Sequence, residues 1–382
     1  MRKTLGLTTL VAGLIAASAA QADITVGFVT SLSGNGSSIG IPYARGIAAA
    51  VEYKSEVNGE KIRLIQLDDG SDPSAATRNA RKLVEEEKVD LLIGTATAPS
   101  TIAMMAVAAE LKVPMIAIAP VTGQPNAADQ WGISIPQPAA LLVKVVADRM
   151  KRDGMKNIGY IGFSDAWGDL VYNGAKAAEA EGGIKVLTNE RYARVDTSVT
   201  GQILKVLAAR PDAVLIGGSG TQGALPLLTL AERGYKGPTY GTMALVNPDF
   251  VRVGAKAAEG ILLSAGPVIV AEQLPDGHFA KKLSLDFRAA YQKANGIPST
   301  DGFSALSFDA WRIFTTAADR ALKTAKPGTV EFRQALRDEI LKTNELPGVH
   351  AVYNFKPGSY LGVDERSLVM VRLTNGAWKY EP

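Results

Sequence analysis

The amino-acid sequence predicts an α/β protein made of two doubly wound units. Strand-like apolar runs alternate with helix-length amphipathic segments, and this alternation starts again near the middle of the chain. A chain of 382 residues is also too long for one hydrophobic core and is typical of two domains. Because strands that alternate with helices form parallel sheets, each predicted strand should be buried on both faces.

The first half contains four predicted strands with three predicted helices between them. Asp72 can cap the second helix, and Pro73 suits the first helical position. The order is that of a parallel sheet with helices on its faces. The predicted strands cover 24–30, 62–69, 89–94 and 113–120, and the predicted helices cover 41–57, a segment that opens at 72–73, and 100–111.

The second half repeats this alternation and then changes character. The tail from His350 onwards reads as antiparallel strands, with a hairpin turn at Thr374-Asn375-Gly376. The segment 255–266 closes the second α/β unit. The strands of this unit are predicted at 157–163, 184–192, 212–218 and 237–242, and its helices at 168–182, 198–210 and 223–234. Three further helices are predicted after the unit, at 277–295, 308–323 and 331–342.

Residues 1–22 have the three parts of a secretory signal peptide. Two cations, Arg2 and Lys3, precede an apolar stretch, and the small residues Ala20 and Ala22 stand before the predicted cleavage site. The apolar stretch is shorter than the roughly 20 residues that a membrane span needs. We therefore expect cleavage after Ala22 and a soluble mature protein in the periplasm.

The composition argues against several classes of function. The chain has 41 Lys and Arg against 38 Asp and Glu, and the signal peptide removes two of the cations, so the mature protein is nearly neutral. Nothing in this balance predicts a nucleic acid or an anionic membrane as a partner. The chain has no cysteine, which excludes a thiol nucleophile, a disulfide and thiolate-bound zinc. His278 and His350 are expected to be surface or packing residues, and neither a metal nor a cofactor is predicted.

The segment GSGTQG at 218–223 matches the glycine pattern of a dinucleotide-binding loop. It does not open a nucleotide-binding domain, and the next strand, PTYGTMAL, ends without the acidic residue that would hold a ribose hydroxyl. A glycine-rich loop between a strand and a helix is the better interpretation.

The acidic segment DDGSD at 68–72 has three carboxylates in five residues. It lacks the distal glutamate of a helix-loop-helix calcium site. The end of a strand, a turn and a helix cap explain it without a metal.

The segment TATAPST at 95–101 can form an anion site. It lies between a predicted strand and a helix whose first amides lack partners, and such a helix terminus attracts anions through those amides and the helix dipole. The next strand ends in Ala119-Pro120-Val121-Thr122, which offers further donors close by. Small hydroxyl residues on two adjacent strand ends suit a carboxylate, although ordinary helix capping explains them equally well.

No arrangement of residues points to catalysis. Neither histidine lies near a candidate serine in a convincing pattern. The sequence therefore gives no support to an enzyme.

A set of segments, taken together, resembles the periplasmic solute-binding proteins of branched-chain amino acid ABC transporters, of the leucine/isoleucine/valine-binding type. The resemblance covers essentially the whole mature chain in order. The segments are ITVGFVTSLSGNGSSIG, IPYARGIAAAVEY, IRLIQLDDGSDPSAATRNARKLV, VDLLIGTATAPSTIAMMAVAAELKVPMIAIAP, SDAWGDLVYNGAK, DAVLIGG and AAEGILL.

The resemblance implies a type I fold in which two α/β lobes are joined by three crossing strands. Closure of the lobes over the ligand produces the shape that a membrane permease recognises. Ligand binding would thus shift the population of molecules from the open to the closed arrangement. The implied partners are a small-molecule carboxylate and an ABC transporter permease, and a monomer is expected. Lobe 1 would comprise 23–140 and 268–347, lobe 2 would comprise 141–267 and 348–382, and the crossings would lie near Pro138, Pro267 and Pro347.

The resemblance also implies a set of ligand contacts. The turn after the first strand would form one lip of the cleft, and the segments at 98–101 and 121–122 would bind the ligand carboxylate. Phe303 would line the far wall. The implied ligand-binding residues are Ser38, Ile39, Ala98, Ser100, Thr101, Val121, Thr122, Phe163, Trp167, Ser219, Met243 and Phe303.

Two of these positions depart from the pattern of the amino acid binders. That pattern has acidic side chains for the ligand ammonium where this chain has Phe163 and Met243. A buried ammonium without a partner costs several kcal/mol, and about 1.4 kcal/mol is a tenfold change in affinity. Apolar, polarisable residues instead suit a hydrophobic body without an amine.

Three hypotheses remain open from the sequence. The first is a periplasmic binding protein for a small carboxylate without an α-amine, such as an aromatic or keto acid. The second is a binding protein for an aliphatic amino acid or amide, with Asp165 as the ammonium partner. The third is an exported α/β enzyme.

Overall fold

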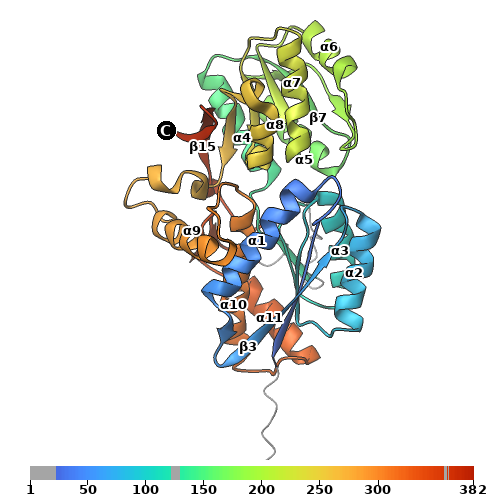
Figure 1. Ribbon diagram of the computed structural model, residues 1–382, viewed down its shortest axis with the longest axis vertical. Helices are drawn as coiled ribbons and strands as arrows, with labels where there is room; N and C mark the ends of the chain where they lie inside the picture. Colours follow the sequence, from blue (N-terminus) through green and yellow to red (C-terminus); the bar gives the residue numbers. More distant parts are fainter. Residues whose placement is uncertain (1–22, 122–129, 357–358, 360) are drawn as a thin grey trace, which may run out of the picture.

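The computed structural model describes residues 23–121, 130–356, 359 and 361–382. Two α/β lobes lie one above the other in Figure 1, each with its own sheet, and the chain passes between them more than once. We call the lobe that holds strands β1–β6 the first lobe and the lobe that holds β7–β12 the second lobe. The predicted signal peptide, 1–22, lies outside the described residues.

The first lobe is built on a six-stranded sheet in the order β2-β3-β1-β4-β5-β6. Apart from the antiparallel β2–β3 pair, neighbouring strands run parallel, as the alternation predicted. Every residue of β1 is buried, which fits a strand covered on both faces. The strands are β1 (Ile24–Thr30), β2 (Glu56–Val57), β3 (Glu60–Asp68), β4 (Leu91–Gly94), β5 (Met115–Ala117) and β6 (Gly132–Ser134).

The helices of the first lobe come from both ends of the sequence. Helix α1 packs against α9 and α10, and α2 packs against α3 (Figure 1). Asp72 caps α2 through the amide of Ser74 at 2.9 Å, with Pro73 at the first helical position. The helices are α1 (Ser37–Tyr53), α2 (Pro73–Glu85), α3 (Ala98–Glu110), α9 (Lys281–Asn295), α10 (Ser304–Ala321) and α11 (Val330–Leu341).

The second lobe is built on an eight-stranded sheet with the main order β16-β15-β12-β11-β10-β7-β8. The predicted strand 184–192 is two short strands, β8 and β9, which both pair with β7. Helices α4 (Ala139–Arg152), α5 (Ala166–Ala180), α6 (Thr200–Ala208), α7 (Leu225–Glu232) and α8 (Pro248–Ala258) surround the sheet. The strands are β7 (Asn157–Phe163), β8 (Lys185–Val186), β9 (Glu190–Tyr192), β10 (Ala213–Gly217), β11 (Thr239–Thr242), β12 (Leu262–Ala265), β15 (Val369–Thr374) and β16 (Ala377–Glu381).

The C-terminal hairpin closes one edge of this sheet. Strands β15 and β16 pair antiparallel, and β15 also pairs antiparallel with β12. The two turn residues, Asn375 and Gly376, have φ angles of +52° and +71°, which a tight hairpin with a right-handed strand twist requires. Both turn amides donate to Glu259, at 2.8 and 2.7 Å. The predicted hairpin turn at 374–376 is confirmed.

Three connections join the lobes. They run from β6 to α4, from β12 to α9, and from the small β13–β14 hairpin (Leu346–Pro347 and Val352–Tyr353) to β15. The exact residues at which one lobe gives way to the other remain a prediction. Within the described part of the chain, no helix combines the length and the apolar character needed to cross a bilayer.

His350 lies where these connections meet. Its Nε2 is 2.6 Å from the carbonyl of Gly302, and its own carbonyl accepts from Gln137 Nε2 at 3.5 Å. A side chain on Gly266 would collide with the ring at Nδ1, and Nδ1 has no partner among the described residues. An added proton on Nδ1 would therefore be buried without an acceptor, and burial lowers the pKa of His350 to about 4.

His350→Gln is expected to change how stability depends on pH. A neutral His350 contributes stability that is present above an unfolded pKa near 6.5 and is lost as the pH falls towards 4. The free energy of unfolding of the wild type, measured against that of the variant by urea titration, should therefore fall by about 3 kcal/mol between pH 7 and pH 4. A difference that stays constant over this range would contradict a neutral, buried His350.

Two features make this comparison specific. Burial raises the pKa of Asp309 to about 6, so the stability that protonated Asp309 contributes is lost as the pH rises through that value. Asp309 is present in both proteins, and its contribution therefore cancels when their free energies of unfolding are subtracted. The control is His278→Gln, because His278 is partly exposed and should show a smaller effect.

Candidate functional site

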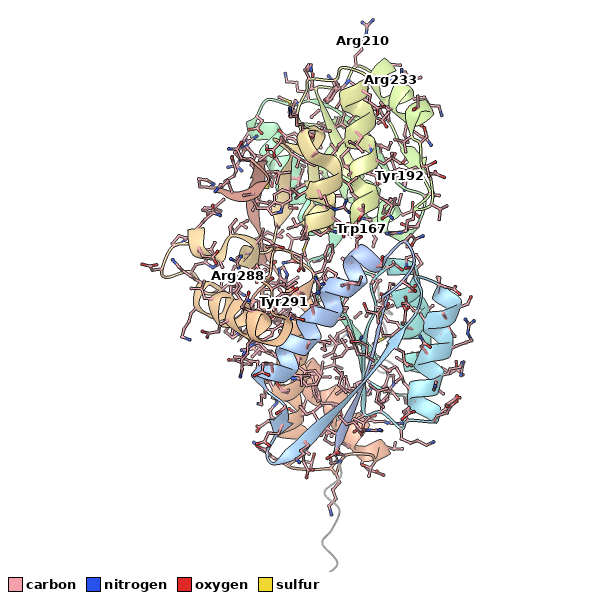
Figure 2. All side chains as sticks on the ribbon, in the orientation of Figure 1. Trp167, Tyr192, Arg210, Arg233, Arg288 and Tyr291 are labelled. Carbon is pink, nitrogen blue, oxygen red and sulfur yellow. The ribbon has the colours of Figure 1, made fainter. Side chains whose placement is uncertain are left out.

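A cavity lies at the junction of the two lobes and takes its walls from both. It encloses about 450 Å³, including the space at its open mouth. Trp167, one of its lining residues, lies at the edge of the second lobe that faces the first (Figure 2). The first lobe contributes Ile39, Tyr43, Ala96, Thr97, Ala98, Ala119, Pro120, Pro136, Phe303 and Leu306, and the second contributes Leu142, Trp167, Arg194, Ser219, Met243 and Ala244.

The topology explains why the cavity is here. Segments of the lining follow strands β4, β5, β10 and β11 directly, and these strands run parallel within their sheets. Loops at the carboxyl ends of parallel strands gather at one edge of a sheet, and ligands of doubly wound proteins bind at that edge. The two lobes present these edges to each other across the cavity.

The first-lobe wall is the N-terminus of α3 and the loop before it. Thr97 caps the helix, with its hydroxyl accepting from the Ser100 amide at 3.4 Å. The buried carboxylate of Asp69 holds the preceding loop, since it accepts from the Ser31 hydroxyl at 2.6 Å and from the Thr95 hydroxyl. The amides of Thr97 and Ala98 have no acceptor among the described residues, so they are available to an anion.

The hydroxyl groups further along α3 are already engaged. Ser100 Oγ accepts from the Thr97 hydroxyl at 3.1 Å, and Thr101 Oγ1 accepts from the Thr95 amide at 3.2 Å. Both residues are fully buried and neither lines the cavity. These hydroxyls stabilise the turn before α3, so the first-lobe donors that reach the cavity are backbone amides.

Tyr43 and Phe303 form the apolar floor of the first-lobe wall. Their rings meet edge to face, with centroids 5.7 Å apart. The Tyr43 hydroxyl donates to the carbonyl of Ile118 at 2.5 Å, and burial raises the pKa of that hydroxyl. The Tyr43 hydroxyl therefore stays protonated at physiological pH and keeps its hydrogen bond to Ile118.

The second-lobe wall carries one cation, Arg194, beside a carboxylate that is turned away. Asp165 caps α5, with one oxygen accepting from the amides of Trp167 and Gly168 at 3.0 and 3.2 Å. Its other oxygen accepts from Arg194 Nε at 2.6 Å. The two side chains are only 19% and 11% exposed. The cap and the ion pair use both carboxylate oxygens, and Asp165 is not among the cavity-lining residues.

Phe163 lies beneath this ion pair. The guanidinium of Arg194 is 4.1 Å from the centroid of the Phe163 ring, and Arg194 Nη1 donates to Ser219 Oγ at 3.0 Å. The stacked ring favours the flat orientation of the guanidinium. Phe163 is therefore a buried support for Arg194 and not part of the cavity lining.

The lobes touch each other beside the cavity. The Thr221 amide donates to Ser38 Oγ at 3.2 Å, and Asn247 Nδ2 donates to the Ser38 carbonyl at 3.4 Å. That carbonyl is free within α1 because Pro42, four residues later, has no N–H to donate to it. Gly220 has a φ of +56°, and a Cβ there would lie 2.6 Å from Ser38 Oγ. The glycine-rich segment 218–223 thus allows the two lobes to approach closely.

The twelve ligand-binding residues predicted from the sequence occupy different places. Ser38 lies at the contact between the lobes, and Ser100, Thr101, Val121 and Phe163 are buried behind the lining. Thr122 lies outside the described residues. Six line the cavity directly: Ile39, Ala98, Trp167, Ser219, Met243 and Phe303.

Arg194 is the lining residue that matters most among those missed by sequence reasoning. It follows β9, a strand that was merged with β8 in the prediction of one strand at 184–192. Because β9 runs parallel to β7, the loop after it lies at the same carboxyl edge as the other site loops. A predicted strand end at Tyr192 would have indicated that Arg194 lies in a loop at the site. Among the described residues, no group of three histidine, aspartate or glutamate side chains could hold a metal ion.

Comparisons with known proteins agree with this architecture. A family model described as periplasmic binding protein matches residues 23–354. Two extracellular ligand-binding receptors of Rhodopseudomonas palustris are similar to the chain: one at 40% identity, with a TM-score of 0.90 over 95% of this chain and 100% of that one, and one from strain HaA2 at 41% identity, with a TM-score of 0.89 over 94% and 100%. The Leu/Ile/Val-binding protein BraC3 of Rhizobium johnstonii is 26% identical over 351 residues, which is 89% of each chain.

The chain belongs to the periplasmic binding protein family. This finding confirms the resemblance drawn from the sequence and the predicted fold class. The family consists of binding proteins and not of enzymes, and it gives no support to the hypothesis of an exported enzyme.

The two functions of Asp165 can be separated by their effect on stability. Asp165→Ala removes both the helix cap and the ion pair, and should lower the free energy of unfolding by about 2 kcal/mol. Asp165→Asn keeps a carbonyl oxygen for the amides of α5, and should cost about half as much. Urea denaturation measures both values.

Thr329→Ala is the matched control, since Thr329 caps α11 through the Phe332 amide at 3.1 Å without an ion pair. It should cost about 1 kcal/mol. Equal costs for Asp165→Ala and Asp165→Asn would contradict a cap at Asp165.

Proposed function

We propose that this chain is the periplasmic substrate-binding component of an ABC importer, and that its ligand is a small organic carboxylate without an α-amine. An aromatic acid or a keto acid fits the cavity best. The ligand lies between the lobes, makes contact with both walls, and holds them closed.

The charge of the lining carries this proposal. Arg194 is the only charged side chain among the described residues that line the cavity. The candidate ammonium partner, Asp165, is committed to the α5 amides and to Arg194. An amino acid that entered the cavity would bring its ammonium to a wall that offers N–H donors and no free carboxylate.

The cost of that mismatch is large compared with a useful affinity. A buried ammonium without a partner costs several kcal/mol, and each 1.4 kcal/mol is a factor of about ten in the dissociation constant. Micromolar binding of leucine would not survive such a loss. An acid without an amine does not incur it.

The carboxylate of the ligand has a suitable partner on the first lobe. The Thr97 and Ala98 amides lie at the N-terminus of the 13-residue helix α3, where unpaired N–H groups and the helix dipole favour negative charge. Ala119 and Pro120, at the end of the neighbouring strand β5, close this side of the cavity.

The rest of the lining suits an apolar ligand body. Ile39, Met243 and Phe303 offer aliphatic, thioether and aromatic surface, all buried. A planar ring can stack against such side chains, and methionine adapts its shape to the ligand. This is the composition expected of a site for a hydrophobic acid.

The alternative is a binding protein for branched-chain amino acids or amides. It is favoured by the name of the relative BraC3, a Leu/Ile/Val-binding protein that is 26% identical to this chain. For this function Asp165 would have to leave both Arg194 and the amides of α5 to reach an ammonium. That rearrangement would also expose the charge of Arg194 to the same ligand.

Several further features belong to the proposal. The signal peptide is removed after Ala22, the mature protein is a monomer, and its partner is an ABC transporter permease. The lobes comprise 23–140 with 268–347 and 141–267 with 348–382. The permease recognises the closed arrangement of the two lobes.

A thermal-shift panel tests the ligand class. Benzoate, phenylpropenoate and phenylpyruvate are compared with leucine, isoleucine and valine at equal concentrations. At least one of the three acids should raise the melting temperature, and the amino acids should not. Stabilisation by the amino acids alone would overturn the proposal.

Asp165→Asn distinguishes the two ligand classes in the same assay. The variant should still be stabilised by the acid, because the acid makes no contact with this carboxylate. Under the alternative, Asp165 is the ammonium partner, and its loss should abolish binding of the amino acid.

Gly220→Ala tests whether binding requires the lobes to close. The added methyl would press on Ser38 Oγ and oppose the closed form, so the affinity for the acid that stabilises the wild type should fall by about tenfold or more. Isothermal titration calorimetry measures the change.

Gly234→Ala is the matched control, because Gly234 has a similar φ of +75° but a methyl group added there would meet nothing within 4 Å. It should leave the affinity unchanged. Equal affinities for the two variants would show that closure at Gly220 is not part of binding.

A further inference from the structure

We propose that Arg194 and Ser219 form a second polar subsite, on the second lobe, that binds a neutral oxygen at the end of the ligand opposite its carboxylate. This inference rests on the proposed function and narrows the ligand class. The ligand is then an acid with two polar ends, such as a hydroxyaryl acid, and not a purely hydrophobic acid.

The unused hydrogen-bond donors of Arg194 are the first evidence. A guanidinium has five N–H donors. One of them is given to Asp165 from Nε and one to Ser219 from Nη1. The remaining donors, on Nη1 and Nη2, have no partner among the described residues, although the side chain is only 11% exposed and lines the cavity. Donors that lack an acceptor on a largely buried, cavity-lining side chain favour a ligand that supplies one.

Ser219 adds a donor at the same place. Its Oγ accepts from Arg194 Nη1 at 3.0 Å, so its own O–H is free to donate. Ser219 lines the cavity and is buried. Both side chains therefore have donors to offer to a ligand oxygen at this place in the cavity.

The surroundings hold these donors in place before a ligand arrives. The ring of Phe163 lies under the guanidinium, with 4.1 Å between the guanidinium carbon and the ring centroid. Asp165 accepts from the amides of α5 and from Nε of Arg194, and so holds that side of the guanidinium in place. A site that is ordered in advance loses less conformational entropy when the ligand binds.

The charge balance favours a neutral oxygen over a second carboxylate. The carboxylate of Asp165 already neutralises Arg194. A further anion would therefore give this nearly buried site a net negative charge, which is costly away from water. A hydroxyl oxygen can accept from the same donors without that cost.

The two walls then divide the recognition of the ligand between them. The carboxylate binds the amides of α3 on the first lobe, and the distal oxygen binds Arg194 and Ser219 on the second lobe. The apolar residues between them contact the ligand body. A ligand of this kind has polar contacts with both lobes and favours their closed arrangement.

Calorimetric titration of matched acids tests the subsite. The acids are benzoate, phenylpropenoate and phenylpyruvate, each with and without a 4-hydroxyl group, together with 4-carboxybenzoate. In at least one pair the 4-hydroxy acid should bind the wild type about tenfold more tightly than its parent, because a hydrogen bond to a charged donor has about this value. 4-Carboxybenzoate should bind more weakly than 4-hydroxybenzoate.

Arg194→Met should remove this advantage, so that the two members of the pair bind within about threefold of each other. The affinity for the parent acid should fall less than the affinity for the 4-hydroxy acid. Because this variant leaves Asp165 without its cation, the double variant Asp165→Asn with Arg194→Met is measured as well and should behave in the same way. The control is Arg191→Met, since Arg191 lies nearby and does not line the cavity.

The outcomes that would overturn the subsite differ from those that would overturn the proposed function. If the 4-hydroxyl group brings no gain in any pair, or if 4-carboxybenzoate binds most tightly, the neutral-oxygen subsite is wrong while the carboxylate ligand stands. If Arg194→Met and the double variant lose the parent acid as well, the carboxylate itself binds Arg194 and the subsite is wrong. If none of the acids binds the wild type, both proposals are wrong.

Discussion

The division of the Asp165 carboxylate between two partners determines the chemistry of the cavity. One oxygen satisfies the first amides of α5, and the other holds Arg194. A free carboxylate at this place would make the second-lobe wall anionic and suitable for an ammonium. With both oxygens engaged, the wall presents N–H and O–H donors instead. Phe163, which replaces an acidic residue in the pattern of the amino acid binders, then serves as the surface on which the guanidinium lies.

The sequence was sufficient for the fold and for the loops that line the cavity, because both follow from general constraints on parallel sheets. Alternating strands and helices imply which loops gather at the carboxyl edges, and residues from the loops after β4, β10 and β11 line the cavity. The direction of single side chains was not accessible in this way. Ser100 and Thr101 are hydroxyl residues at the right helix end, yet both hydroxyls are used within the turn. Local hydrogen bonds of this kind compete with ligand contacts, and residue type alone does not reveal which of the two prevails.

Helix α1 shows how a contact between distant segments can change a local prediction. A helix that begins at 41 would place Pro42 in the first turn, where its missing N–H has no cost. The helix begins instead at Ser37, so that Pro42 leaves the Ser38 carbonyl without an intrahelical partner. Asn247 of the second lobe donates to this carbonyl. The unfavourable proline thus leaves a polar group at the surface where the lobes meet.

The contacts between the lobes at this surface are too weak to determine closure by themselves. The hydrogen bonds to Ser38 are 3.2 and 3.4 Å long, and such bonds contribute only about 0.5–1.5 kcal/mol each after exchange with water. A molecule that bridges the two walls would add to these contacts and favour the closed arrangement. An acid with one polar end would engage the α3 amides and leave the donors of Arg194 unsatisfied. An acid with a second oxygen would satisfy both walls at once, and in this way the same donors that select the ligand would also couple its capture to the closure of the lobes.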